Sequence, residues 1–279
     1  MRLGWAVLLG AFLLACKHPP ETAKLAGAVA EPPAKAAEPA PPVIELPETA
    51  PPATVERLLV PGDLVASMVR GTTKKPPLTV FIAGLCSNAE AYLYTFPQAA
   101  QKQGGVVAIE GDQLCGPGVD PRYRTYSWDA NRQHARIEAA LAAAGVTEIP
   151  KEGLTLVGYS QGAAIAEQLA AKYPQRYARI VLIASPTDPA PRDFARSRAL
   201  VTMACSRDAS LSRMKSTASA TTKIGTPSTY FQMPDCTHGQ VADGENIFGQ
   251  SFDWLSSNER PLKGDAQNLA PVRIVGPPS

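Results

Sequence analysis

The chain has 279 residues and a formal net charge of +2, with a net charge of +4 on the part that follows residue 56. The basic residues of that part are scattered, and Arg192, Arg196 and Arg198 are interpreted as a solvated loop and strand edge, so we expect no nucleic-acid partner. Residues 17–56 contain ten Pro and ten Ala without apolar periodicity, which indicates a semi-extended linker. About 220 residues remain, enough for a single α/β core.

The N-terminus has the pattern of a secretory signal. Met1-Arg2 precedes an apolar run from Leu3 to Leu14, which is too short to span a membrane comfortably. Leu13-Leu14-Ala15-Cys16 resembles the lipobox of bacterial lipoproteins. That resemblance implies cleavage before Cys16, a diacylglyceryl thioether on it, and tethering to a membrane of the cell envelope, on the periplasmic face or the cell surface. The alternative is an ordinary signal peptide, cut after Ala15, that leaves a free thiol.

The rest of the chain alternates between predicted strands and helices. Two apolar segments flanking Pro61-Gly62-Asp63 predict a hairpin. A continuous apolar run predicts a strand buried on both faces at residues 78–83, and the apolar residues 154–157 predict a short buried strand. Further strands are predicted at residues 106–109, 180–184, 200–204 and 229–233. Helices are predicted at residues 89–103, 131–144 and 163–172. This order predicts an α/β fold with a mostly parallel sheet covered by helices on both faces.

The stretch Gly158-Tyr159-Ser160-Gln161-Gly162 lies between a predicted strand and a predicted helix. Strand, sharp turn and helix in this order form a nucleophile elbow, in which a strained turn exposes the serine hydroxyl above the sheet edge. Gly158 and Gly162 let the strand and the helix approach closely, because neither carries a Cβ. Ser160 is therefore the candidate nucleophile. The alternative is an ordinary strand-to-helix turn whose serine caps the helix.

A serine hydroxyl needs a base to take its proton, and histidine is the usual base. Of the three histidines, His18 lies in the linker and His134 in a predicted surface helix that precedes the serine. His238 follows the last predicted strand, where functional side chains collect in open α/β sheets. We therefore expect His238 to be the base; the alternative is an exposed loop or helix-capping histidine.

The base needs a carboxylate that fixes its tautomer and stabilises its charge. Asp208 follows the predicted strand at residues 200–204 after a short turn and is the first candidate. Asp188, after the preceding strand, is the second candidate. Asp235 and Asp243 are disfavoured because they lie close to the histidine in the sequence. The alternative for Asp208 is a solvated turn residue.

The order Ser160, Asp208, His238 is the one expected of the α/β-hydrolase fold. Residues 57–256 resemble a compact α/β-hydrolase, similar to small esterases of the carboxylesterase, dienelactone hydrolase and polyester depolymerase kind. The resemblance implies a three-layer α/β sandwich. The elbow also resembles that of cutinases, but this match is local, so cutin is not carried over as the substrate.

An oxyanion needs two main-chain N–H donors aimed at one point. Gln161, which follows the nucleophile, should supply one. The resemblance to hydrolases places the other at Leu85, with Cys86 as the alternative. Many relatives have His-Gly in this loop, whereas this chain has Ala83-Gly84. That change leaves the two main-chain donors in place but affects the shape of the oxyanion hole, the site that they form.

Besides Cys16 there are four cysteines, which an exported chain tends to pair. Of the three possible connectivities, we favour Cys86 with Cys115 and Cys205 with Cys236, because each pair then joins the ends of strands predicted to be neighbours. The second bridge would fix the Asp208 and His238 loops and add roughly 3 kcal/mol of stability. The alternative is four buried thiols. A zinc site is disfavoured because no cysteine pair has the usual short spacing.

Fifteen residues separate Ala184 from Leu200, too few for the helical lid of larger lipases. This favours an open site for short acyl chains or a polymer surface, with Trp128, Phe194 and Phe231 as lining or core residues.

The sequence thus predicts a signal peptide (1–15), a linker (16–56), a hydrolase domain (57–256) and a C-terminal extension (257–279), in which residues 272–275 are a candidate edge strand.

We expect a monomeric serine hydrolase that cleaves small or polymeric carboxylic esters through an acyl-enzyme, with neither metal nor cofactor. A thioesterase, peptidase or acyltransferase would use the same machinery, because the fold does not choose among these reactions. The alternative from another class is a catalytically silent binding lipoprotein.

Overall fold

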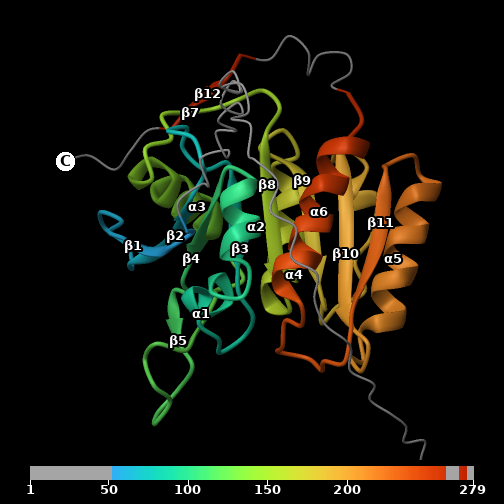
Figure 1. Ribbon diagram of the computed structural model, residues 1–279, viewed down its shortest axis with the longest axis horizontal. Coiled ribbons are helices and arrows are strands. Elements are labelled where there is room, and N and C mark those ends of the chain that lie inside the picture. The colour runs from blue at the N-terminus through green and yellow to red at the C-terminus, as the bar shows by residue number, and fades with distance from the viewer. Residues whose placement is uncertain (1–51, 262–269, 275–279) are drawn as a thin grey trace, which may run out of the picture. The chain divides into compact units, whose positions relative to one another are not determined.

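The computed structural model describes residues 52–261 and 270–274 (Figure 1). They belong to one compact unit, Thr49–Ser279. The predicted signal peptide, Cys16, His18 and most of the linker lie outside the described residues. Within the described ranges, no helix has both the length and the apolar character that crossing a membrane requires.

The main sheet positions the site. Among the described residues it has eight strands, in the order β1-β2-β4-β3-β8-β9-β10-β11. In chain order these are β1 (Val55–Leu58), β2 (Ala66–Arg70), β3 (Thr79–Ile82), β4 (Gly105–Ile109), β8 (Leu154–Tyr159), β9 (Tyr177–Ile183), β10 (Ala199–Cys205) and β11 (Ser228–Met233). The predicted hairpin is β1–β2; β2 runs antiparallel to β1 and β4, and all other neighbours pair in parallel. The mostly parallel sheet is thus confirmed.

Helices cover both faces of this sheet. Helices α1 (Ala89–Leu93), α2 (Pro97–Lys102) and α6 (Gly244–Asn258) cover one face, and Figure 1 shows α2 and α6 in front of the strands. Helices α3 (Ala130–Ala143), α4 (Gln161–Lys172) and α5 (Leu211–Lys223) cover the other, together with the 3-10 helix η1 (Pro191–Phe194). Because both faces are covered, the central strands read as continuous apolar runs, and β3, β4, β8 and β10 are buried along their whole length. The three-layer α/β sandwich is confirmed.

The predicted helix at residues 89–103 is in fact two helices. Asn88 caps α1, since its side chain accepts a hydrogen bond from the Ala91 main-chain N–H at 2.8 Å. Pro97 begins α2, because proline lacks an N–H and suits the first turn of a helix. The main sheet begins at Val55 and α6 ends at Asn258, so the folded core extends two residues beyond each predicted domain boundary.

Two short strand pairs lie outside the main sheet. The first joins β5 (Gln113–Leu114) and β6 (Arg124–Thr125), and the second joins β7 (Glu148–Ile149) and β12 (Val272–Arg273), both antiparallel. The candidate edge strand at residues 272–275 forms at Val272–Arg273, where it pairs with β7 and not with the main sheet. Sequence patterns did not reveal these pairs, since two residues carry no periodicity.

Candidate active site

The turn between β8 and α4 holds Ser160 in a strained conformation. Its backbone has φ 52° and ψ −115°, in the left-handed region that non-glycine residues rarely adopt. A Cβ on Gly158 would collide with the main chain of Gly162, and a Cβ on Gly162 would collide with the main chain of Ile82. Gly158 is therefore required for the close approach of β8 and α4 that the sequence predicts, whereas Gly162 allows α4 to approach the neighbouring strand β3.

The structure brings the three candidate side chains together at the carboxyl end of the sheet. Ser160 Oγ lies 2.9 Å from His238 Nε2, and His238 Nδ1 lies 2.9 Å from Asp208 Oδ2. The Asp208 carboxylate also accepts a hydrogen bond from the Ser210 main-chain N–H at 2.8 Å. The Asp208 side chain is 2 % exposed and that of His238 is 49 % exposed. A buried carboxylate thus orients an accessible imidazole toward the serine.

The electrostatics of Asp208 suit that arrangement. Burial alone would raise the pKa of its carboxyl group, but hydrogen bonds from Ser210 and His238 outweigh burial and lower the pKa. Asp208 is therefore ionised at neutral pH and can stabilise positive charge on His238.

The other candidate histidine is far from this cluster in the fold. His134 lies on α3, where its ring stacks on Tyr173 at a centroid distance of 4.0 Å and its Nδ1 lies 2.8 Å from the Tyr177 hydroxyl. It is thus a partly buried packing residue. His18 lies outside the described residues.

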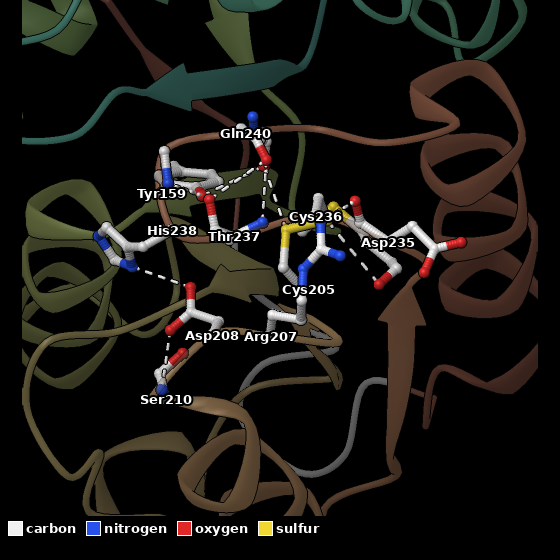
Figure 2. The surroundings of a disulfide bond; sticks show 12 residues. Tyr159, Cys205, Arg207, Asp208, Ser210, Asp235, Cys236, Thr237, His238 and Gln240 are labelled. Atoms are coloured by element: carbon white, nitrogen blue, oxygen red, sulfur yellow. Dashed lines mark hydrogen bonds and ion pairs between the residues drawn. A yellow bond between two sulfur atoms is a disulfide. The ribbon is translucent and has the colours of Figure 1, made fainter.

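The alternative acids do not contact His238. Asp188 is 90 % exposed and pairs with Arg213 at 2.6 Å. The Asp235 side chain points away from His238 in Figure 2. Asp243 precedes α6 and accepts a hydrogen bond from Asn246. Of the acids considered, Asp208 is the one placed against the imidazole.

The structure forms the two favoured cysteine pairs, Cys86–Cys115 and Cys205–Cys236. Figure 2 shows the second bridge between the Asp208 and His238 segments. Cys205 is the last residue of β10, and Cys236 follows β11. The bridge therefore joins the two loops that carry Asp208 and His238.

Two tyrosines hold the His238 loop, and sequence reasoning missed both. The Tyr159 hydroxyl accepts a hydrogen bond from the Gly239 main-chain N–H at 2.7 Å and donates to the Gln240 carbonyl at 3.3 Å. The Tyr92 hydroxyl donates to the Gly239 carbonyl at 3.2 Å, and burial raises the Tyr92 pKa to about 12, so the donor stays protonated. Tyr159 lies inside the elbow motif, but the motif accepts any residue at that position and so does not indicate a role for it.

The residues expected to form the oxyanion hole lie beside Ser160. Gln161 is the first residue of α4, and Leu85 follows β3 in a loop that packs against the serine, since a Cβ on Gly84 would lie 3.2 Å from Ser160 Cβ. Within residues 52–261 and 270–274, no acceptor takes a hydrogen bond from the Gln161, Leu85 or Cys86 main-chain N–H. All three amides remain available to a ligand, so the choice between Leu85 and Cys86 stays open.

The Gln161 side chain has a further role that the motif does not reveal. Its amide group binds the Tyr126 main chain twice, accepting from the N–H at 3.1 Å and donating to the carbonyl at 3.0 Å. The buried Tyr126 hydroxyl in turn accepts from the Ala83 N–H at 3.1 Å and donates to the Ile109 carbonyl at 2.6 Å. This network ties the start of α4 to the end of β3.

A cavity of about 510 Å³ opens beside His238 and Asp208. It is lined by loops that follow β9, β10 and β11, including Ser185 and Thr237, and by Arg213 of α5. Residues 184–198, between β9 and β10, form only η1 and short loops, in agreement with the expected lack of a lid. Of the three aromatic residues considered there, Phe194 belongs to the core, Phe231 is partly buried and Trp128 is exposed.

The described residues contain no group of three or more His, Cys, Asp or Glu side chains arranged to hold a metal ion.

A family model described as alpha/beta hydrolase fold matches residues 80–202, which include the elbow. The chain has the α/β-hydrolase fold. No curated protein sequence matches this chain significantly. The α/β-hydrolase assignment fits the strand order and the place of Ser160 between β8 and α4.

Solved structures agree with this assignment of the fold. A protein described as a predicted CIB-like hydrolase from Thermoplasma acidophilum has a TM-score of 0.53 at 16% identity, over 74% of this chain and 99% of that one. The esterase domain of a Rhodothermus marinus protein has a TM-score of 0.50 at 16% identity, with the same coverage. FphF, a fluorophosphonate-binding serine hydrolase of Staphylococcus aureus, has a TM-score of 0.50 at 12% identity, again over 74% and 99%. At such low identity these likenesses concern the fold.

Proposed function

We propose that the protein is a serine hydrolase that cleaves carboxylic esters through an acyl-enzyme. One observation carries the proposal: Ser160 Oγ, His238 and Asp208 form a continuous chain of hydrogen bonds, each 2.9 Å long. In such a chain the histidine takes the serine proton while the carboxylate fixes its tautomer and stabilises the imidazolium. A scaffold that only binds has no need of all three groups in this order.

In the proposed reaction, Ser160 Oγ attacks the ester carbonyl carbon while His238 Nε2 takes the hydroxyl proton. His238 then gives that proton to the departing alcohol, which leaves an acyl group on Ser160. Water, deprotonated by the same imidazole, attacks the acyl carbon and releases the acid and the free serine. Asp208 stays ionised throughout.

The main-chain N–H groups of Gln161 and Leu85 are the proposed oxyanion donors, with Cys86 as the alternative to Leu85. Support comes from their place on either side of Ser160 and from the absence of an acceptor for these amides within the described ranges. Donors that are already oriented need no reorganisation when negative charge develops on the carbonyl oxygen.

The open cavity beside His238 favours esters with short acyl chains or ester groups at a polymer surface. The residues between β9 and β10 do not provide a deep apolar tunnel, because Phe194 is packed into the core.

We further propose export and anchoring through a lipid on Cys16, on the basis of the signal pattern and the lipobox-like Leu13-Leu14-Ala15-Cys16. Mass analysis of the mature N-terminus tests this anchor: a peptide that begins at an unmodified Cys16 would contradict it.

Hydrolysis of p-nitrophenyl esters from acetate to dodecanoate tests the reaction. We expect activity to fall with chain length and to vanish in Ser160→Ala. Asp208→Asn should keep the fold but reduce kcat by about 10⁴-fold, because an amide neither stabilises the imidazolium nor selects the productive tautomer. Full activity of Ser160→Ala would contradict the proposal.

A fluorophosphonate probe separates the proposed enzyme from a catalytically silent binding protein. An activated serine reacts covalently, so the probe should label the wild type at Ser160 and leave Ser160→Ala unlabelled. Labelling without ester hydrolysis would favour a thioesterase, peptidase or acyltransferase. No labelling would favour the silent protein.

A further inference from the structure

A second cavity, of about 350 Å³, lies at the amino ends of the central strands. Its walls come from β7, β12, the segment between α4 and β9, and Arg196 after η1. Ser160 follows the carboxyl end of β8, whereas Arg176 immediately precedes β9, so the cavity and the candidate active site lie at opposite ends of the sheet. In Figure 1 the β7–β12 pair lies above the sheet, and the β5 hairpin lies below it.

Four cationic side chains line this cavity, and none of its lining residues in the described ranges carries a carboxylate. The four cations are Lys151, Lys172, Arg176 and Arg196. Glu138 pairs with Arg176 at 3.4 Å, but within the described residues no carboxylate lies within 4.0 Å of the charged groups of Lys151, Lys172 or Arg196. Like charges gathered around one concave surface create a positive potential that attracts anions.

Arg176 is the most buried of the four cations. Its side chain is 19 % exposed, and its Nη1 is buried without a hydrogen-bond partner among the described residues. A buried guanidinium N–H without an acceptor is rare, because such a group loses its hydration and gains nothing in return. The Nη2 of Arg176 pairs with Glu138, and the accessible part of the side chain lines the cavity and adds to its positive charge.

We propose that this cavity binds a phosphate ester. Guanidinium and ammonium groups together suit the several oxygens of a phosphate, through charge-assisted hydrogen bonds. The volume exceeds what a lone phosphate ion needs, and the apolar walls, which include Tyr173, Pro174 and Val272, provide a surface for the organic part of the ester. The same chemistry is presented by an anionic phospholipid headgroup and by a soluble phosphate ester.

Titration calorimetry of the full chain with glycerol 3-phosphate, at low salt and in a buffer without phosphate, tests the proposal. We expect saturable binding that weakens as salt is added, and no binding of glycerol itself. Lys172→Gln with Arg196→Gln should weaken binding at least tenfold, whereas a matched pair of exposed cations elsewhere, Lys75→Gln with Lys223→Gln, should change it less than twofold. Each double substitution removes two charges from exposed residues that are not part of the core, so both variants should fold.

Ser160→Ala should bind glycerol 3-phosphate as the wild type does, because the two sites are separate. No saturation by the wild type up to about 10 mM would overturn the proposal, as would equal weakening in the two double variants.

Vesicles distinguish the two sources of the phosphate. We expect the full chain to bind phosphatidylcholine vesicles that contain phosphatidylglycerol more strongly than pure phosphatidylcholine. Any N-terminal anchor is the same in all variants, so a loss specific to the Lys172 and Arg196 pair would identify the lipid headgroup as the ligand. Equal vesicle binding by all variants, together with specific binding of glycerol 3-phosphate, would identify a soluble phosphate ester.

Discussion

Tyr126 joins the two chain segments that are proposed to supply the oxyanion donors. Its main chain is held by the Gln161 side chain at the start of α4, and its hydroxyl holds the Ala83 N–H just before the Leu85 loop. Because Tyr126 is buried and does not touch the cavity beside His238, we regard it as a positioning residue.

Tyr126→Phe should lower kcat about tenfold with little change in KM. The variant leaves the Ala83 N–H and the Ile109 carbonyl unpaired, so the β3 loop loses the contact that fixes its donors relative to α4. The two buried groups should also lower the free energy of unfolding by about 1–3 kcal/mol. Steady-state kinetics and urea unfolding measure the two effects.

Tyr177→Phe is the matched control for that substitution. Tyr177 is equally buried, and its hydroxyl contacts His134 at the other end of the sheet. We expect a loss of stability in this variant with kcat unchanged. If Tyr126→Phe also kept full kcat, Tyr126 would be a purely structural residue.

At the scale of elements, the proposed acid and the proposed base lie on separate loops that one disulfide connects. Asp208 is three residues after Cys205, and His238 is two residues after Cys236. Parallel strands bring both loops to one edge of the sheet, and the bridge limits their movement relative to each other. We therefore expect this disulfide to affect both stability and the Asp208–His238 contact.

Replacement of both Cys205 and Cys236 by alanine should reduce the free energy of unfolding by roughly 3–4 kcal/mol, from the entropy of a loop of 31 residues. It should also slow fluorophosphonate labelling of Ser160, measured where the variant is still folded. The Cys86 and Cys115 pair closes a loop of 29 residues and is a control for the loss of stability alone, because Cys86 lies in the loop proposed to supply an oxyanion donor. Labelling at the wild-type rate in the folded Cys205 and Cys236 variant would show that the bridge does not align acid and base.

At the scale of the whole molecule, the sequence predicted the long elements and the residues that follow them. The central strands are apolar runs because both faces of the sheet are covered. Ser160 directly follows β8, Asp208 follows β10 after a short turn, and His238 lies in the loop after the edge strand β11. Topology then brings strand ends together, so the cluster could be predicted from chain order alone.

The remaining features depend on contacts between distant segments, which no local pattern records. The β7–β12 pair joins residues more than 120 positions apart. The hydrogen bonds of Tyr126 and Tyr159 likewise arise only after the sheet has formed, and an isolated tyrosine in the sequence does not reveal its partner. The break between α1 and α2 is different, because Pro97 was visible in the sequence and marked the new helix start.

The stability of the whole domain should depend on pH through Glu167 on α4. Its partly buried carboxyl group accepts a hydrogen bond from the Ala190 main-chain N–H at 2.6 Å. Burial raises the pKa of Glu167 to about 7, against the opposing effect of that hydrogen bond. The folded state therefore holds a proton that the unfolded chain releases at lower pH.

Between the unfolded pKa of Glu167, near 4.5, and its folded pKa, near 7, the folded state binds more protons, so the free energy of unfolding falls as pH rises. Glu167→Gln stays neutral and keeps an oxygen that can accept from Ala190. We expect this variant to match the wild type near pH 4 and to be more stable by about 1 kcal/mol near pH 8, after allowance for solvent screening.

Urea unfolding at both pH values measures the difference, with the exposed Glu148→Gln as control. Parallel pH profiles for Glu167→Gln and the wild type would show that Glu167 is ionised in the folded state throughout this range, and that burial does not control its charge.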